Sequence, residues 1–503
     1  MLNKTVKQYP EKTAIVYGSS RISYQELYSN ILGLSKGLSS IGVKQSDCVA
    51  LILPNCPEFA VSFYATAKLN AIALLLHPSF KESDIKHYVI DSNASVIITD
   101  HTRAEVCRKV ISELDQKVEL VVVGGENSLG ICFQDLIHKP VDDLPENASY
   151  EGDVLYQYSS GSTGRPKRIC RTQNNLFHES NNSVLTLNIT ESDNILCIVP
   201  LYHAYGFGVC LLAAINAGAT LVILEPYLQD GVPVEMPFVF RRPRVLELIE
   251  EEQISVLPAV PYLFSILAAT PPETHASLPS LKLCISAGNF LSKDIFDKFQ
   301  QRFGIPIRQL YGCTEAGAMA INMKAEAEIK PDSIGLPMKN VEIKVMDDKG
   351  DELPSGIVGE LVVSSQTLTS GYYNAPEVNK ESFKSGHFFT GDLGKKDEQG
   401  YLYITGRKKI FIDTGGYKVD PLEVEDVLNS HPKVEEVVVV GTSRPYAGEM
   451  IKAVVVSKGE CQEDELLSYC KDKLPEFKVP RVIEFREEIP KSALGKILRK
   501  DLV

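Results

Sequence analysis

The sequence lacks the cysteine spacing of a metal site or a disulfide framework. Its eleven cysteines are scattered, with no C-x-x-C pair and no Cys/His ligand pattern. An odd number without spacing is typical of buried or incidental thiols in a reducing compartment. We therefore expect neither zinc nor disulfides, and we expect a cytoplasmic location.

The chain also lacks an excess of positive charge. It has 52 Lys and Arg against 65 Asp and Glu, a formal net charge of -13. Residues 407–503 carry 17 Lys and Arg and 18 Asp and Glu, so nearly all the excess acid lies before them. An acidic body argues against a dedicated binder of nucleic acid or of anionic membranes.

An export signal is not apparent, and one segment calls for a membrane test. The N-terminus, MLNKTVKQYPEKT, has no apolar core region. Residues 204–224 are uncharged for 21 residues, long enough to cross a bilayer. Gly206, Gly208 and Gly218 and the break at Asn216 favour instead a buried helix, a turn and a buried strand. We therefore expect a soluble protein without a membrane span.

The length of 503 residues predicts at least two domains. Short β-rich runs separated by helix-length segments are typical of βα units in a mostly parallel sheet, and they occur at 47–53, 94–100, 118–125, 195–200, 220–226, 254–260 and 281–288. From 341 to 363 the pattern changes to strands, with DDKG as a hairpin signal.

A different, small α+β pattern begins after YITGRKK, with the order helix, strand, strand, helix and strand from residue 421 to residue 487. We place a domain boundary near residues 406–410 and expect two domains, 1–406 and 407–503. The predicted fold class is α/β, with a large N-terminal domain of layered sheets, a small β-rich subdomain, and a smaller C-terminal α+β domain.

The stretch SSGSTGRPK, residues 159–167, holds four hydroxyls, two glycines and two cations, and proline is its one apolar residue. Backbone N–H groups, hydroxyls and a lysine can together bind a polyphosphate. The spacing Gly161-x-x-Gly164-x-x-Lys167 is neither the GxxxxGK[ST] of a mononucleotide P-loop nor the GxGxxG of a dinucleotide fold. A flexible surface turn is the alternative, and this stretch alone does not decide between them.

Further unusual clusters follow in order along the chain: PLYHAYGF at 200–207, YGCTE at 311–315, FFTGDLG at 388–394, GRKKIFIDTGGYKVDPLEVE at 406–425 and PKSALGKILRKDL at 490–502. Together with SSGSTGRPK they resemble the adenylate-forming superfamily, which includes acyl- and aryl-CoA synthetases, nonribosomal peptide adenylation domains and beetle luciferases. The resemblance covers essentially the whole chain.

The resemblance implies an ATP and Mg²⁺ site. Tyr311 is similar to the ring that stacks on adenine, Asp392 to the carboxylate that binds both ribose hydroxyls, and Glu315 and Thr163 to the groups near magnesium. The full set of implied nucleotide contacts is Ser159, Ser160, Gly161, Ser162, Thr163, Gly164, Lys167, Gly288, Gln309, Tyr311, Gly312, Thr314, Asp392, Arg407 and Lys496. A packed core tyrosine and a turn aspartate are the structural alternatives for Tyr311 and Asp392.

Lys496 is the catalytic residue that the resemblance favours most. A carboxylate is a poor electrophile, so the acid first attacks the α-phosphate of ATP, and a nearby cation stabilises the charge that grows on oxygen. His203, Thr163 and Glu315 are the other implied catalytic residues. A basic tail helix is the alternative for Lys496.

The acid and the thiol have their own implied residues. His203, Tyr205, Ala287, Gly288 and Gly312 resemble the acid pocket. Amino-acid-activating members have an Asp beside this histidine, where this chain has Ala204, so a neutral fatty or aryl acid is favoured. Lys409 resembles the hinge of a mobile C-terminal domain, and Gly415 and Gly416 resemble the loop that admits a pantetheine arm. A hairpin turn is the alternative for that loop.

Three functions remain open. The first is an acid:CoA ligase that uses ATP, Mg²⁺ and CoA, as a monomer or homodimer. The second is a stand-alone adenylating enzyme that loads an acyl or peptidyl carrier protein; GYKVDPLEVE differs from the RNHYP-like version of fatty acyl-AMP ligases, which favours the first. The third is a catalytically weak binding module, suggested by Arg168 where the family has Gly and Gln173 where it has His. A cation at Arg168 could alter loop mobility or pyrophosphate release.

Overall fold

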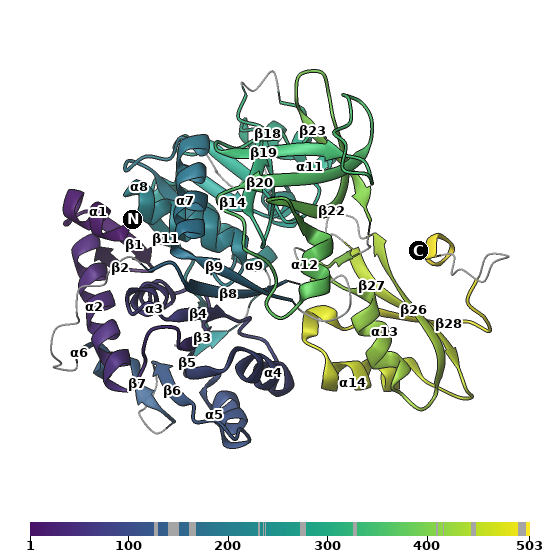
Figure 1. The fold of residues 1–503 in the computed structure, drawn as a ribbon, viewed down its shortest axis with the longest axis horizontal. Helices are drawn as coiled ribbons and strands as arrows, with labels where there is room; N and C mark the ends of the chain where they lie inside the picture. Colours follow the sequence, from purple (N-terminus) through teal and green to yellow (C-terminus); the bar gives the residue numbers. More distant parts are fainter. Residues whose placement is uncertain are drawn as a thin grey trace. The chain divides into compact units, whose positions relative to one another are not determined.

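The computed structural model describes residues 1–124, 129–138, 150–159, 167–229, 232–234, 236, 238–271, 278–324, 329–408, 411–415, 417–443, 449–490 and 499–503 (Figure 1). These residues form two compact units. The first comprises Met1–Pro78, Asp84–Gln157 and Arg168–Gly406, and the second comprises Ser79–Ser83, Tyr158–Lys167 and Arg407–Val503.

A seven-stranded sheet in the order β7-β6-β5-β3-β4-β8-β9 forms one layer of the first unit. Its strands are β3 (Cys48–Ile52), β4 (Ile72–Leu75), β5 (Ala94–Asp100), β6 (Glu119–Val123), β7 (Ile131–Cys132), β8 (Asp153–Ser159) and β9 (Lys167–Thr172). The pairs from β7 to β8 are parallel. Strand β3 is buried along its whole length, as its unbroken apolar run predicts for a sheet covered on both faces.

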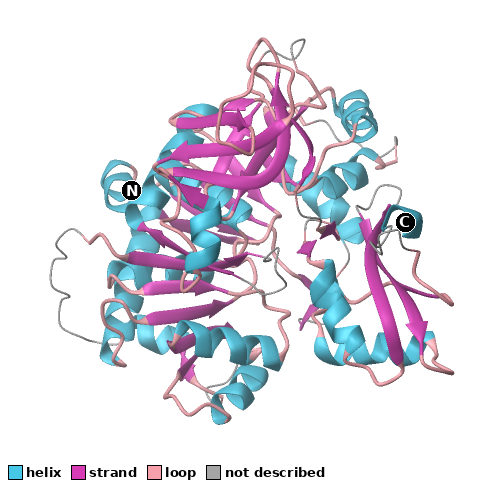
Figure 2. Cartoon of the chain, turned by 45° about the vertical axis from the view of Figure 1, so that its right-hand side comes forward, coloured by secondary structure: helices cyan, strands magenta, loops and turns pink. Residues whose placement is uncertain are grey.

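A nine-stranded sheet in the order β18-β17-β16-β15-β14-β10-β11-β1-β2 forms the second layer. Its strands are β1 (Thr13–Tyr17), β2 (Ser20–Ser23), β10 (Asn194–Cys197), β11 (Thr220–Ile223), β14 (Val256–Ala259), β15 (Leu283–Ser286), β16 (Ile307–Cys313), β17 (Gly317–Ile321) and β18 (Leu336–Pro337). The strands from β1 to β16 in this order run parallel. Figure 2 shows the strands in magenta with cyan helices beside them.

Helices accompany both sheets. In order they are α1 (Leu2–Gln8), α2 (Tyr24–Ser40), α3 (Pro57–Lys68), α4 (Glu82–Ser92), α5 (Ala104–Ser112), α6 (Phe133–His138), α7 (Gln173–Leu187), α8 (Ala213–Ala217), α9 (Phe238–Glu251), α10 (Pro261–Ala268), α11 (Lys293–Phe303) and α12 (Pro376–Ser382). Helix α7 begins with a capping box, in which the Thr172 hydroxyl accepts from the Asn175 N–H and the Asn175 side chain accepts from the Thr172 N–H. Thr172 therefore ends β9 and starts α7 at a defined point.

The uncharged segment 204–224 is a helix, a turn and a buried strand, as predicted. It forms the π-helix η1 (Gly206–Leu212), continues into α8, and ends at Gly218, which has a left-handed conformation (φ 75°). Strand β11 follows and is wholly buried. In the part of the chain that is described, we find no helix long and apolar enough to cross a membrane.

An antiparallel sheet completes the first unit. It contains β19 (Val341–Met346), β20 (Gly359–Ser365), β21 (Phe383–Lys384), β22 (His387–Lys396) and β23 (Leu402–Arg407). The DDKG turn forms, with the Gly350 N–H donating to the Asp347 carbonyl at 3.1 Å. It does not join β19 directly to a long partner strand, because a single Met346–Glu352 bridge follows before β20 begins at Gly359. A short hairpin is therefore embedded in a longer connection.

The second unit has the α+β order that the sequence predicts. Its elements are β24 (Ile412–Asp413), β25 (Lys418–Val419), α13 (Pro421–Asn429), β26 (Val434–Ser443), β27 (Glu449–Ser457), α14 (Glu463–Lys473) and β28 (Val482–Phe485). Strands β26 and β27 are antiparallel, and β28 is parallel to β27. The predicted α/β class, with layered sheets, a β-rich part and a smaller α+β part, is confirmed.

Candidate functional site

Tyr311 and Asp392 meet in the first unit, from β16 and β22. The Tyr311 hydroxyl donates to Asp392 Oδ2 at 2.6 Å, and the two residues are 9% and 5% exposed. The Asp392 N–H donates to the Thr390 hydroxyl at 3.0 Å. Burial, and then the charge of Asp392, raises the pKa of Tyr311 well above its ordinary value. The phenol therefore keeps its proton and remains a donor to the carboxylate.

Glu315 is a second buried carboxylate, just after β16. Tyr372 donates its hydroxyl to Glu315 Oε1 at 2.8 Å, and the Thr369 N–H donates to the Glu315 carbonyl at 2.9 Å. Glu315 is 8% exposed. Its side chain and backbone are thus both held by the segment that follows β20. In the described part of the chain, no three His, Cys, Asp or Glu side chains gather as a ready-made metal cage.

Gln309 and Gly312 lie on the same strand as Tyr311. Gln309 is 7% exposed, and its amide oxygen Oε1 is buried without a hydrogen-bond partner among the described residues. A Cβ at Gly312 would lie 2.5 Å from the Gly317 carbonyl oxygen across the β16–β17 hairpin, so only glycine fits. Thr314 is partly buried in the turn of that hairpin. A buried orphan acceptor beside these groups is a place where a ligand donor could bind.

The residues expected around the acid lie in the segments that follow β10 and β15 of the nine-stranded sheet. His203 is exposed, and its Nδ1 accepts from the Tyr205 N–H at 3.2 Å. Tyr205 donates its hydroxyl to the Ile285 carbonyl at 2.9 Å, and burial raises its pKa well above the ordinary value. Ala287 is buried and Gly288 has φ 88°, both just beyond β15. The Tyr205 hydroxyl, Ala287 and Gly288 therefore lie at the carboxyl end of β15, where α/β sheets bind ligands, whereas His203 lies in the segment that follows β10.

The remaining predicted residues belong to the second unit or lie outside the described residues. Ser159 ends β8 and Lys167 begins β9; Arg407 ends β23. Gly415, with φ 76°, lies in the turn of the β24–β25 hairpin. The residues outside the described ranges are Ser160, Gly161, Ser162, Thr163, Gly164, Lys409, Gly416 and Lys496.

Arg168 and Gln173 are the two departures from the family pattern. Arg168 is 5% exposed, donates from Nη1 to the Asp91 carbonyl at 2.7 Å, and lies 3.4 Å from the centroid of the Tyr373 ring. Its charge is therefore enclosed by groups of the first unit. Gln173 is exposed at the first position of α7. An effect of Arg168 on loop mobility or pyrophosphate release stays a prediction.

Sequence reasoning missed a buried polar group next to this site. Arg171 of β9 and Glu179 of α7 form an ion pair at 2.6 Å, with 1% and 2% exposed. Tyr372 and Thr369, which hold Glu315, were missed as well. Arg171 lies between Arg168 and Gln173 in the chain, but nothing local distinguishes a buried arginine from a solvated one, because the partner groups come from distant segments.

The chain is similar to proteins of one kind along its whole length. The family model described as "AMP-binding enzyme" matches residues 2–373, and the one described as "AMP-binding enzyme C-terminal domain" matches residues 423–496. A feruloyl-CoA synthase from Amycolatopsis sp. is 31% identical over 99% of this chain and 97% of its own. A long-chain-fatty-acid–CoA ligase from Bacillus subtilis is 29% identical over 100% and 93%. Among solved structures, the o-succinylbenzoate CoA synthetase from Bacillus subtilis matches with a TM-score of 0.86, 25% identity, and 100% and 97% coverage.

Proposed function

Because this chain belongs to the AMP-binding enzyme family, we propose that it is an acid–thiol ligase which activates a carboxylic acid with ATP and transfers the acyl group to CoA. The observation that carries the proposal is the match of both family models to one chain, together with the buried Tyr311–Asp392 pair and Glu315. Curated relatives that span the chain include CoA ligases named for long-chain fatty acids, for a feruloyl group, for 4-coumarate and for oxalate.

The proposed reaction has two steps. A carboxylate oxygen attacks the α-phosphorus of ATP, the bond to the β-phosphate oxygen breaks, and pyrophosphate leaves with that electron pair. The thiol of CoA then attacks the acyl carbon, loses its proton, and releases AMP with the oxygen that came from the acid. The protein has to position the two reactants and stabilise charge on oxygen.

The buried strand residues suit the nucleoside part of ATP. Asp392 would accept from the ribose hydroxyls, since an ionised carboxylate can accept several hydrogen bonds. Tyr311 would contact adenine, and the orphan oxygen of Gln309 would accept a donor from the nucleotide. The proposed contacts with the phosphates are Ser159, Ser160, Gly161, Ser162, Thr163, Gly164 and Lys167. Further proposed contacts with ATP are Gly288, Gly312, Thr314, Arg407 and Lys496.

Magnesium fits the donor set of the site. Glu315 offers carboxylate oxygen, the ligand that Mg²⁺ prefers, and Tyr372 orients this group by donating to Oε1. Thr163 would add a hydroxyl. When bound, the ion would neutralise phosphate charge. Glu315 would hold the ion during the first step, and Tyr372 would keep the Glu315 carboxylate in its orientation.

The acid side favours a carboxylate without an ammonium group. Ala204 stands where amino-acid-activating relatives carry an acidic residue, so nothing at this position would pair with a charged amine. His203 and Tyr205 would face the carboxylate, and Ala287, Gly288 and Gly312 would leave room for the acyl part. We propose a fatty or aryl acid as the substrate.

We further propose that residues 1–406 bind acid and ATP and that residues 407–503 form a mobile domain carrying Lys496. Lys409 would be the hinge, and Gly415 and Gly416 would admit the pantetheine arm of CoA. The eleven free cysteines suit a reducing cytoplasm. A monomer or homodimer is expected, to be measured by light scattering.

A two-stage experiment tests the proposal. Purified protein is assayed for acid-dependent ATP–pyrophosphate exchange against a panel of short-chain, long-chain, aryl and amino acids. The accepted acid is then offered with free CoA or with a phosphopantetheinyl carrier protein. We expect exchange with fatty or aryl acids and thioester formation with CoA. Transfer to the carrier protein alone would favour the stand-alone adenylating enzyme, and no exchange with any acid would overturn the proposal.

A further inference from the structure

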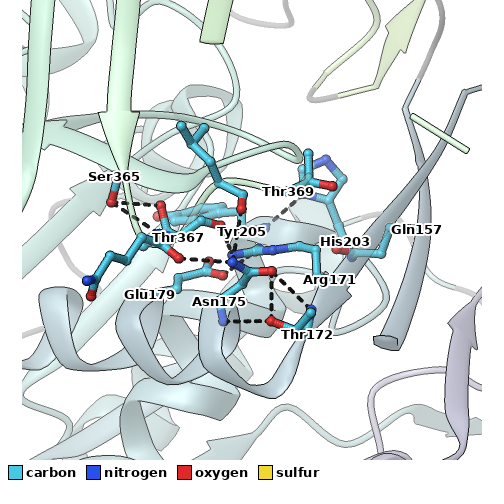
Figure 3. A network of polar contacts seen from close by, with 12 residues as sticks. Gln157, Arg171, Thr172, Asn175, Glu179, His203, Tyr205, Ser365, Thr367 and Thr369 are labelled. Atoms are coloured by element: carbon cyan, nitrogen blue, oxygen red, sulfur yellow. Dashed lines mark hydrogen bonds and ion pairs between the residues drawn. The ribbon is translucent and has the colours of Figure 1, made fainter. Parts of the chain in front are cut away.

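Arg171 and Glu179 form the most deeply buried ion pair of the described residues (Figure 3). Arg171 Nη1 donates to Glu179 Oε2 at 2.6 Å, and the side chains are 1% and 2% exposed. Arg171 Nε is also buried, without a partner among the described residues. A buried ion pair, imperfectly satisfied, is not an efficient way to stabilise a fold, because apolar groups of similar volume often do as well or better. Stability of the fold alone therefore does not account for this ion pair, and a functional role is the alternative.

The carboxylate of Glu179 fills a space that two glycines leave open. A Cβ at Gly208, in η1, would lie 2.2 Å from Glu179 Oε1, and a Cβ at Gly317, which begins β17, would lie 2.4 Å from the same atom. Gly208 follows His203 and Tyr205 in the chain, and Gly317 follows Glu315 by two residues. The carboxylate thus packs between the segment of the acid side and the segment of the nucleotide side.

Arg171 holds a third segment through its other nitrogen. Its Nη2 donates to the Thr367 carbonyl at 2.9 Å. The neighbouring Asn175 donates to the Gln366 and Leu368 carbonyls, both at 2.9 Å, and the Thr369 hydroxyl donates to the Cys170 carbonyl at 2.6 Å. The segment 366–369 is therefore fastened to the β9–α7 junction.

That segment supports Glu315 directly. The Thr369 N–H donates to the Glu315 carbonyl at 2.9 Å, so Arg171 acts on the backbone of Glu315 through residues 367–369. Glu179 acts on the same hairpin from the other side, at Gly317. One ion pair consequently contacts three backbone segments. The segment of Gly208 follows His203 in the chain, and the segments of Gly317 and of residues 366–369 both adjoin Glu315.

We propose that Arg171 and Glu179 are positioning residues for acid activation, which set the acid-side segment at the correct distance from the Glu315 hairpin. The inference rests on the proposed function, because it uses the roles assigned to His203 and Glu315. Attack on the α-phosphorus requires both sides at once, and an ångström-scale misplacement can reduce such a rate about 100-fold. Transfer from a finished acyl-adenylate to CoA requires no contact with the departing pyrophosphate.

The test separates positioning from folding by replacing both charges together. Arg171→Met with Glu179→Leu removes the pair without leaving an uncompensated buried charge. We expect a melting temperature close to that of the wild type, an acid-dependent ATP–pyrophosphate exchange rate lower by roughly 10- to 100-fold, and near-normal thioester formation from CoA and chemically supplied acyl-adenylate. A merely structural role would lower both half-reactions equally, through the fraction of folded protein.

Arg244→Met serves as a matched control. Arg244 pairs with Glu225 at 2.7 Å and Glu251 at 2.8 Å in the same unit, with 30% of its side chain exposed. Its hydrogen bonds go to Glu225, Glu247 and Glu251, none of which is a proposed site residue. Both half-reactions should be unchanged in this variant.

A steric cycle gives a second test that leaves the ion pair in place. The three atoms nearest to a Cβ at Gly208 all belong to Glu179, so Gly208→Ala should push the carboxylate aside and slow exchange about tenfold. In the background Arg171→Met with Glu179→Ala the same change should have less than about a twofold effect, because the clash is gone.

The outcomes distinguish this inference from the proposed function. If the wild-type protein catalyses exchange, the ligase proposal stands, and three results would each overturn the positioning role. The first is a normal exchange rate in the charge-free variant, Arg171→Met with Glu179→Leu, and the second is an equal loss of rate in both half-reactions of that variant. The third is an equal effect of Gly208→Ala in both backgrounds. Absence of exchange in the wild-type protein would overturn both. If the charge-free variant does not fold, the Gly208→Ala effect on the two half-reactions of the otherwise native protein decides.

Discussion

The proposed nucleotide side and the proposed acid side of the site are built differently. Tyr311, Asp392 and Glu315 are all less than 10% exposed, and each has a side-chain partner within 2.8 Å. On the proposed acid side, His203 is exposed, and Ala287 and Gly288 carry no polar side-chain atoms. Under the proposed function, preformed polar contacts would fix the part of the chemistry that every acid shares, whereas space and backbone shape would set which acid fits.

The largest loss should come from Lys496→Ala, which removes the charge proposed to stabilise the transition state of adenylation. We expect adenylation to fall by a factor of ~10²–10³, as for loss of one preorganised charge-stabilising group. Single-turnover formation of acyl-adenylate measures this step. Arg499→Ala, in the adjacent tail, is the control and should retain the rate. Normal adenylate formation by the Lys496 variant would remove the proposed catalytic role.

Asp392→Ala should break the nucleotide side alone. Loss of a charged acceptor costs about 1.5–3 kcal/mol per hydrogen bond, so we expect kcat/KM for ATP to fall roughly 10- to 100-fold. The KM for the acid should change little. The comparison between the two sides fails if the acid KM rises as much as the ATP KM in steady-state exchange assays.

Tyr372→Phe should weaken the nucleotide side more gently. The hydroxyl that donates to Glu315 Oε1 is lost, while the ring is retained. A hydrogen bond to a charged group of about 1.5 kcal/mol corresponds to roughly a tenfold higher Mg²⁺ requirement. Magnesium titration of the exchange rate measures it. Tyr373→Phe, one residue along and 48% exposed, is the control; an equal shift in both variants would exclude a specific effect on Glu315.

His203→Ala should have the smallest effect and should act on the acid side. A neutral hydrogen bond contributes about 0.5–1.5 kcal/mol, so we expect the KM for the acid to rise roughly 2- to 10-fold with an unchanged KM for ATP. Tyr202→Phe, a neighbouring change, should leave both constants unaltered. An ATP KM that rises with the acid KM would place His203 on the nucleotide side instead.

Local sequence patterns predict much of this molecule because many of its elements are encoded locally. Segment 204–224 shows how: its glycines and the Asn216 break give a helix, a turn and strand β11. The same reasoning finds the buried strands β3, β10 and β15, whose apolar runs are continuous. The π-helical form of residues 206–212 has no local signature that we recognise.

Long-range polar contacts are where sequence reasoning stops. Tyr311 and Asp392 are 81 positions apart, and Arg171 and the Thr367 carbonyl are 196 apart. No periodicity links such residues, and the resemblance alone brought the first two together. Arg168 shows the same limit. From the sequence it is a cation in a loop next to Lys167, and only the structure shows its contacts with the Asp91 carbonyl and the Tyr373 ring.

The most direct measurement follows the carboxylate oxygen of the acid. An accepted acid labelled with ¹⁸O in its carboxylate is converted with ATP and CoA, and the phosphorus products are analysed by mass spectrometry. Attack on the α-phosphorus predicts one ¹⁸O atom in AMP and none in pyrophosphate. Unlabelled AMP, or ADP with ¹⁸O in inorganic phosphate, would contradict activation of the acid as an acyl-adenylate.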